Sequence, residues 1–202
     1  MDRKVAPGMV WIPWAMILTR ALLCPLIVLG ALRGWDGRYL GLIVLVALAS
    51  DIYDGVIARR LGSDTPALRL SDSAADTVFY IGVAVALWVS RPQIIRENRV
   101  LLAVLLGLEI ARYGFDFWKF GKGASYHSYL AKCWGLVMAV ALIAVISFNA
   151  LHWMVGLSLM LGILNNIEGL AMSAILPVWR NDVKTLQIAL RIRREMPENK
   201  PK

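Results

Sequence analysis

Six long apolar stretches alternate with short polar connections along this chain. They cover residues 10–32, 40–58, 75–90, 100–117, 130–148 and 151–178. A helix needs about 20 mostly apolar residues to cross about 30 Å of hydrocarbon. The pattern therefore predicts an all-α integral membrane protein with six transmembrane helices.

The composition agrees with this prediction. Hydrophobic residues make up 58% of the 202 residues, charged residues only 18%, and the mean hydropathy is +0.61, which exceeds the apolar share of an ordinary soluble domain. No internal repeat is visible, and the connections are too short to hold a second domain. We expect one domain over residues 1–202 that ends in a short basic tail from about residue 180.

The basic residues predict the orientation in the membrane. Six spans place both termini on one side, and fifteen of the 22 lysines and arginines fall on that side, against five on the other. The excess of positive charge marks the cytoplasmic side. We expect the termini and the connection between the second and third spans to face the cytoplasm, at a bacterial inner membrane.

The net charge of the chain is +8. Its basic residues lie at the predicted membrane edges and in the tail, which favours anionic lipid over nucleic acid as a partner.

Residues 50–80 place an unusual number of carboxylates between two apolar segments. At 100° per residue, Asp51 and Asp54 lie about 60° apart on one helix, and Asp72 and Asp76 about 40° apart on the next. Such groups can cap helices or pair with nearby arginines in a solvated loop. However, ionised side chains at membrane depth are costly and are normally paired, metal-bound or hydrated. Four carboxylates at these spacings favour a site for two divalent cations.

The same residues form a recognisable motif. Asp51-Ile-Tyr-Asp54-Gly-Val-Ile-Ala-Arg59 is followed by eight residues, Leu68, three residues, Asp72, three residues and Asp76. This resembles the signature of the CDP-alcohol phosphotransferase family, D-x-x-D-G-x-x-A-R-x8-G-x3-D-x3-D. Every spacing matches, and the one departure is Leu68, where the family has glycine.

The resemblance implies a six-helix membrane enzyme, usually dimeric, with its site on the cytoplasmic side. Such an enzyme transfers a substituted phosphate group from a CDP-linked donor, commonly CDP-diacylglycerol, to an alcohol and releases CMP. This is a step of phospholipid biosynthesis. Two metal ions are implied, commonly Mg²⁺, with Mn²⁺ as an alternative.

The resemblance also assigns roles to residues of this sequence. The implied metal ligands are Asp51, Asp54, Asp72 and Asp76. Asp72 and Asp76 would be catalytic, with Asp76 as general base. The implied lining of the nucleotide pocket is Gly55, Ala58, Arg59 and Leu68.

Leu68 leaves three outcomes open. It narrows the nucleotide pocket and changes donor choice, or the backbone shifts to accommodate it, or the chain binds a CDP-lipid without catalysis. A divalent-cation transporter is a further alternative from a different class. Transporters often show paired half-repeats with a site at the midplane, whereas here the aspartates lie at a membrane border.

Three further basic residues are candidates for contacts with the acceptor or with phosphate. Arg20 lies within the first span, whose start resembles the opening helix of the same family, and either faces the site or snorkels to the interface. Arg112 stands three residues after Glu109, which permits a local ion pair. Lys132 follows the fourth span, at a border where basic residues are common for topological reasons.

Overall fold

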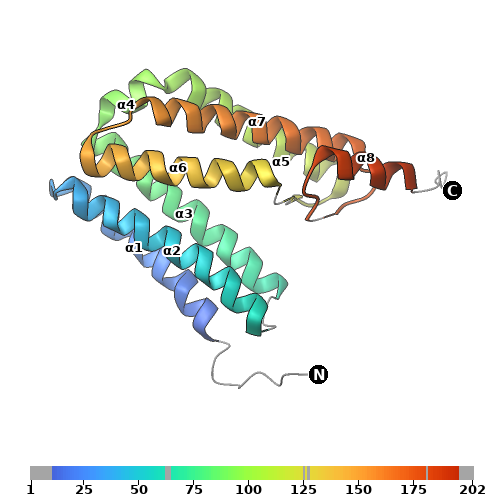
Figure 1. Cartoon of the computed structure of the whole chain (residues 1–202), viewed down its shortest axis with the longest axis horizontal. Coiled ribbons are helices and arrows are strands. Elements are labelled where there is room, and N and C mark those ends of the chain that lie inside the picture. Colours follow the sequence, from blue (N-terminus) through green and yellow to red (C-terminus); the bar gives the residue numbers. More distant parts are fainter. Residues whose placement is uncertain (1–10, 62–64, 125, 127, 181, 196–202) are drawn as a thin grey trace. The chain divides into compact units, whose positions relative to one another are not determined.

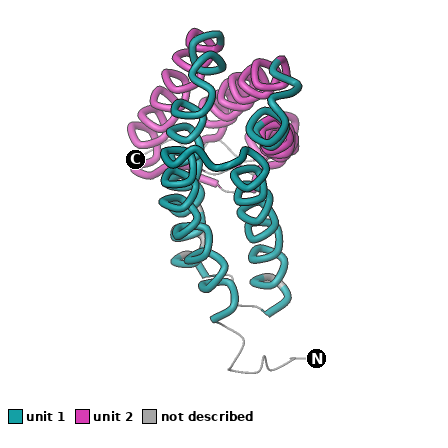
Figure 2. Tube along the Cα trace, turned by 90° about the vertical axis from the view of Figure 1, so that its left-hand side faces the viewer, with its two compact units in different colours: residues 1–97, 142–152 teal, residues 98–141, 153–202 magenta. Residues whose placement is uncertain are grey.

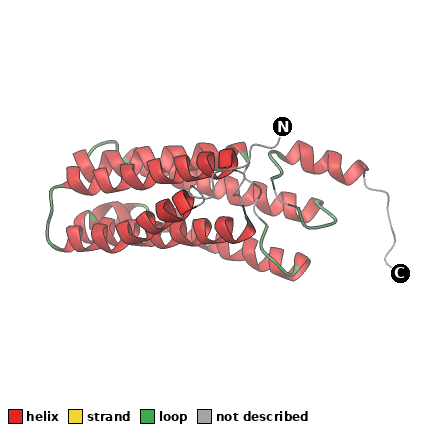
Figure 3. Ribbon diagram, turned by 90° about the horizontal axis from the view of Figure 1, so that it is seen from below, coloured by secondary structure: helices red, strands yellow, loops and turns green. Residues whose placement is uncertain are grey.

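A computed structural model of the chain describes residues 11–61, 65–124, 126, 128–180 and 182–195, with the backbone alone for Arg59, Pro66, Arg69, Leu70 and Ser73. Within these residues every regular element is a helix (Figure 3). The helices are α1 (Trp11–Leu32), α2 (Gly37–Leu61), α3 (Pro66–Ser90), α4 (Pro92–Glu97), α5 (Arg99–Phe120), α6 (Tyr129–Phe148), α7 (Trp153–Ile175) and α8 (Leu186–Glu195). The prediction of an all-α chain is confirmed.

Six of these helices, α1, α2, α3, α5, α6 and α7, coincide with the six apolar segments expected from the sequence. Four of the six are long and apolar enough to cross a membrane: Trp11–Leu32, Gly37–Ala58, Tyr129–Phe148 and Trp153–Ile175. In α3 the apolar part is only Ala74–Ser90, and α5 carries several charged residues along its length. The four helices indicate an integral membrane protein, and six spans stay a prediction.

Helix α3 begins nine residues before the expected span, at residue 66 instead of 75. Thr65 caps its first turn, because the Thr65 hydroxyl accepts the backbone N–H of Leu68 at 3.2 Å. Pro66 occupies the first turn, where its missing N–H costs nothing. Since α2 extends to Leu61, only residues 62–65 lie between the two helices.

The chain divides into two compact units (Figure 2). The first comprises residues 1–97 and 142–152, and the second residues 98–141 and 153–202. Helix α6 contributes to both, because the boundary falls between residues 141 and 142. The expectation of a single domain stays a prediction.

In the first unit α1 packs against both α2 and α3 (Figure 1). Small residues permit close approach, as is usual between membrane helices. A Cβ atom on Gly82 of α3 would lie 2.6 Å from the Cys24 sulfur of α1, and one on Gly37 would lie 2.0 Å from the carbonyl oxygen of Ile146. These contacts hold α3 against α1 and the start of α2 against the end of α6.

In the second unit α5 packs against α7, and α8 packs against α7. Helix α8 lies within the segment expected only as a basic tail. It is helical because Leu186, Ala189 and Ile192 recur every three residues and join an apolar cluster with Met172 and Leu176 of the preceding segment. Its arginines at 191, 193 and 194 are exposed.

Replacement of Gly37 by alanine tests the contact between α2 and α6. The added Cβ would meet a backbone oxygen, which cannot rotate away. We expect Gly37→Ala to cost about 1–3 kcal/mol of stability, measured as a lower Tm in detergent micelles. Gly107→Ala in α5 is the matched control, because no atom lies within 4 Å of its added Cβ. Equal Tm values for the two variants would contradict the close contact.

Candidate functional site

The last turns of α2 carry the first two carboxylates. Asp51 and Asp54 lie one helical turn apart, so their side chains leave the same face of the helix. Asp54 is buried, at 4% exposure, whereas the Asp51 side chain is 43% exposed. Asp54 therefore lies on the packed side of α2, whereas Asp51 lies on its exposed edge.

The first turns of α3 carry the other two. The early start of this helix at Pro66 makes residues 72 and 76 helical, so Asp72 and Asp76 also lie one turn apart on one face. Their side chains are about one-third exposed, at 34% and 32%. The cap at Thr65 thus fixes the geometry of this second pair.

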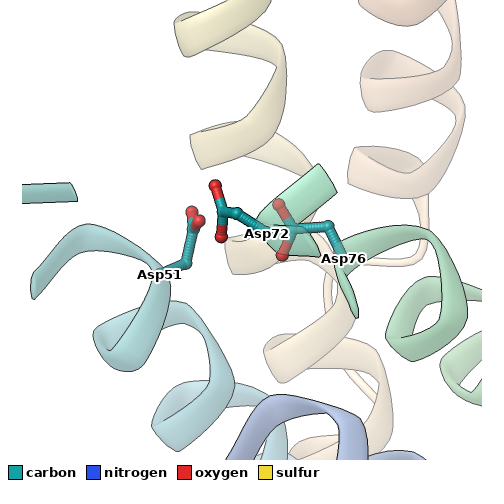
Figure 4. Close-up of side chains that lie close together, drawn as sticks. All are labelled: Asp51, Asp72 and Asp76. Atoms are coloured by element: carbon teal, nitrogen blue, oxygen red, sulfur yellow. The ribbon is translucent and has the colours of Figure 1, made fainter. Parts of the chain in front are cut away.

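Three of the four carboxylates converge. Figure 4 shows the side chain of Asp51 from α2 directed toward those of Asp72 and Asp76 from α3. One oxygen atom from each lies within 4.8 Å of the others. The fourth carboxylate, Asp54, is joined to this group through Arg20.

Arg20 of α1 lies among all four aspartates. Its Nη2 donates to Asp54 Oδ2 at 2.5 Å, and its Nη1 donates to Asp72 Oδ1 at 2.8 Å and to Asp76 Oδ1. The same Nη1 lies 3.5 Å from Asp51 Oδ1. The Arg20 side chain is 1% exposed, so it does not snorkel toward the membrane surface.

The charges of this cluster do not balance. When ionised, its four carboxylates carry four negative charges and Arg20 supplies one positive charge, which leaves three negative charges on helices that otherwise read as membrane spans. Buried charge of one sign is costly without partners. An all-oxygen carboxylate set suits Mg²⁺ and Mn²⁺. The chemistry of the donor set and the convergence of three carboxylates therefore fit a divalent metal.

The residues expected at the nucleotide pocket lie beside this cluster. Gly55 is partly buried and Ala58 is buried on α2. The side chain of Arg59 lies outside the described part of the chain. Leu68 is buried at 5% exposure and packs with Ile17, Ala58 and Ala75. Its backbone continues the regular first turn of α3, so no local distortion of the helix accompanies the departure from glycine.

Arg112 and Lys132 lie in the second unit. Arg112 Nη2 donates to Glu109 at 2.8 Å, which forms the local ion pair that the spacing permits, and its Nε donates to Asn166 at 2.8 Å. Lys132 is exposed and its Nζ lies 5.9 Å from the centre of the Tyr129 ring. Their roles toward acceptor or phosphate stay predictions.

One buried carboxylate was missed at the sequence level. Asp116 of α5 is completely buried, and it accepts hydrogen bonds from the Ser173 hydroxyl and, at 3.2 Å, from the backbone N–H of Ala124. Tyr126 hydrogen-bonds the same serine at 2.7 Å. This network ties the segment after α5 to α7. An acidic residue within an apolar segment is the signal that could have revealed it.

Comparison with known proteins identifies the family. The family model described as CDP-alcohol phosphatidyltransferase matches residues 10–174, which include Arg20 and all four aspartates. Searches of curated proteins and of solved structures found no match. The match covers most of the 202 residues, and the resemblance noted in the motif is thereby confirmed: this chain belongs to the CDP-alcohol phosphatidyltransferase family.

Proposed function

We propose that this protein transfers the phosphatidyl group of CDP-diacylglycerol to an alcohol and releases CMP, as a step in phospholipid biosynthesis. The family supports transfer of a phosphatidyl group from a CDP-alcohol. The observation that carries the proposal for this chain is the approach of Asp51, Asp72 and Asp76 to within 4.8 Å of one another. These are motif positions, and their approach supplies the negative charge that a metal-assisted phosphoryl transfer requires.

The four aspartates would hold two divalent ions, with Mg²⁺ preferred and Mn²⁺ as a substitute. When bound, such ions neutralise the pyrophosphate of the donor and stabilise the charge that develops during transfer. The acceptor hydroxyl oxygen would attack the β-phosphorus, and the bond from that phosphorus to the oxygen of CMP would break. Asp76 would accept the hydroxyl proton, while Gly55, Ala58 and Arg59 would contact the nucleotide.

The proposal includes the membrane arrangement. The chain would cross a bacterial inner membrane six times, with both termini and the aspartates on the cytoplasmic side, and it would act as a homodimer. The excess of lysine and arginine on that side supports the orientation. Arg112 and Lys132 would contribute positive charge toward the acceptor or the donor phosphates.

A second candidate function rests on Leu68. Its side chain packs against Ala58, which is itself assigned to the nucleotide pocket. Leucine therefore occupies volume that glycine would leave open beside the cluster. With this volume filled, the chain would bind a CDP-lipid without catalysing transfer and would be a catalytically impaired member of the family.

Replacement of Asp76 tests its assignment as general base. We expect Asp76→Asn to lower CMP formation from CDP-diacylglycerol by about 100-fold or more, because the amide cannot accept the proton. Labelled donor and a panel of alcohol acceptors provide the assay. Asp36→Asn is the matched control, since Asp36 is exposed and its side chain accepts the backbone N–H of Arg38 at 2.8 Å, a bond that the asparagine oxygen can also accept. The control should stay within about twofold of the wild type, and similar losses in both variants would remove the role of Asp76.

Removal of divalent metal tests the assignment of the aspartates. Dialysis against a chelator should abolish CMP release, and Mg²⁺ or Mn²⁺ should restore it, because four ionised carboxylates would otherwise repel the donor pyrophosphate. Full activity in chelator with any acceptor would exclude a metal-dependent reaction.

Substitution of Leu68 by glycine separates the two candidate functions. If the leucine blocks the pocket, Leu68→Gly should show CMP release that the wild type lacks, despite a stability cost of about 2–5 kcal/mol from the lost apolar contact. Wild-type protein that already releases CMP would rule out the impaired alternative. In that case a change of donor preference in Leu68→Gly would indicate that the leucine tunes the pocket.

A further inference from the structure

Arg20 contacts carboxylate oxygens of the three residues that could hold a metal ion. Its Nη1 donates to Oδ1 of Asp72 and to Oδ1 of Asp76, and lies 3.5 Å from Oδ1 of Asp51. Asp51, Asp72 and Asp76 are the three residues that converge in Figure 4. We propose that Arg20 is an internal counter-cation, which occupies the aspartate cluster when no divalent ion is bound and leaves it when such ions bind. The inference rests on the proposed function insofar as the cluster binds metal.

A divalent ion and the Arg20 guanidinium would compete for the same carboxylates. A small divalent cation sits about 2.0–2.1 Å from carboxylate oxygens, whereas the Arg20 nitrogen lies 2.8 Å from Asp72 Oδ1. If the cation and the guanidinium contacted the same carboxylate oxygens, the two positive groups would lie very close together. Like charges at that separation repel strongly where water is scarce. We therefore expect the guanidinium to withdraw from these carboxylates when a divalent ion binds them.

Metal binding would remove the net negative charge that surrounds Arg20. Without metal its single positive charge faces four carboxylates. Two divalent ions would supply four positive charges and neutralise the carboxylates completely, which leaves the guanidinium without a counter-charge. Because arginine stays protonated in proteins, it then needs another anion. The pyrophosphate of the donor provides one, and the flat guanidinium fork suits paired phosphate oxygens.

The present position of Arg20 is not fully satisfied. Its Nε is buried and has no hydrogen-bond partner among the described residues, although both Nη atoms are bonded to carboxylates. A buried N–H without a partner disfavours the state in which it occurs. In this position Arg20 neutralises part of the negative charge of the cluster, but one of its own N–H donors has no partner among the described residues. A second binding position for the guanidinium would account for this arrangement.

Metal affinity without nucleotide tests the inference. Mn²⁺ binding to the purified full-length protein can be titrated calorimetrically or by electron paramagnetic resonance at about pH 8.5, where protons compete weakly for carboxylates. We expect Arg20→Gln to bind Mn²⁺ at least about tenfold more tightly than the wild type, because the competing cation is gone. The metal-free variant should melt about 5–10 °C lower, and saturating Mn²⁺ should remove most of that difference. Unchanged or weaker Mn²⁺ binding would overturn the inference, since Arg20 would then hold the carboxylates in both states.

A second variant keeps the test decisive if Arg20→Gln does not fold. Arg20→Lys retains the charge but contacts fewer carboxylates than the guanidinium fork, so its Mn²⁺ affinity should lie between those of the wild type and the glutamine variant. Affinity at or below the wild-type value would again contradict the inference. Arg91→Gln is the control for loss of a partly buried arginine in the same unit, because Arg91 caps the far end of α3, fifteen residues after Asp76. It should leave the Mn²⁺ affinity unchanged.

The outcomes separate this inference from the proposed function. Wild-type protein that binds Mn²⁺ and releases CMP, together with an Arg20→Gln variant that binds no more tightly, removes the exchange of cations and leaves the transferase. Wild-type protein that binds no Mn²⁺ removes both the exchange and the metal-dependent reaction.

Discussion

Negative charge on α2 and α3 must be matched by positive charge, and this requirement governs the first unit of the protein. Asp51, Asp54, Asp72 and Asp76 are carried by helices that are otherwise apolar, and burial makes unmatched carboxylates costly. Arg20 on a third helix, α1, supplies positive charge and contacts all four carboxylates. Helix α1 therefore belongs to the site as much as the two helices that carry the motif.

The fold supplies the precision that this ion-pair network needs. Gly82 lets α3 approach Cys24 of α1, so the arginine and the carboxylates lie within hydrogen-bonding distance. Thr65 and Pro66 start α3 early enough to make both of its aspartates helical. Backbone features that carry no charge thus decide where the charged groups meet, and a shift of one turn in α3 would move Asp72 and Asp76 by about 5.4 Å along the helix axis relative to Asp51.

The apolar periodicity was sufficient to predict six long helices and the shared faces of Asp51 with Asp54 and of Asp72 with Asp76. It could not predict α8 or the first turn of α3, because capping by Thr65 and packing by Ala189 decide these elements more than hydropathy does. The motif identified the carboxylates, but it did not predict that Arg20 contacts all four of them. A sequence shows that a buried arginine needs partners, whereas the choice among partners depends on how three helices pack.

Leu68 illustrates the same limit. Its departure from the motif was visible in the sequence, and its consequence depended on neighbours from two other helices. Ile17 and Ala58 surround it together with Ala75 of its own helix, so the side chain became part of the apolar packing beside the aspartates.

The position of the Arg20 network near the start of the chain has a consequence for biosynthesis. Arg20 and its four partners all lie between residues 20 and 76, so every member of the network is translated before α5 begins at Arg99. The hydrogen bonds of Arg20 close loops of 34 to 56 residues, and the entropic cost of closing a loop rises only slowly with its length. The three N-terminal helices can therefore neutralise one another's charges during insertion into the bilayer, while most of the second unit is still untranslated.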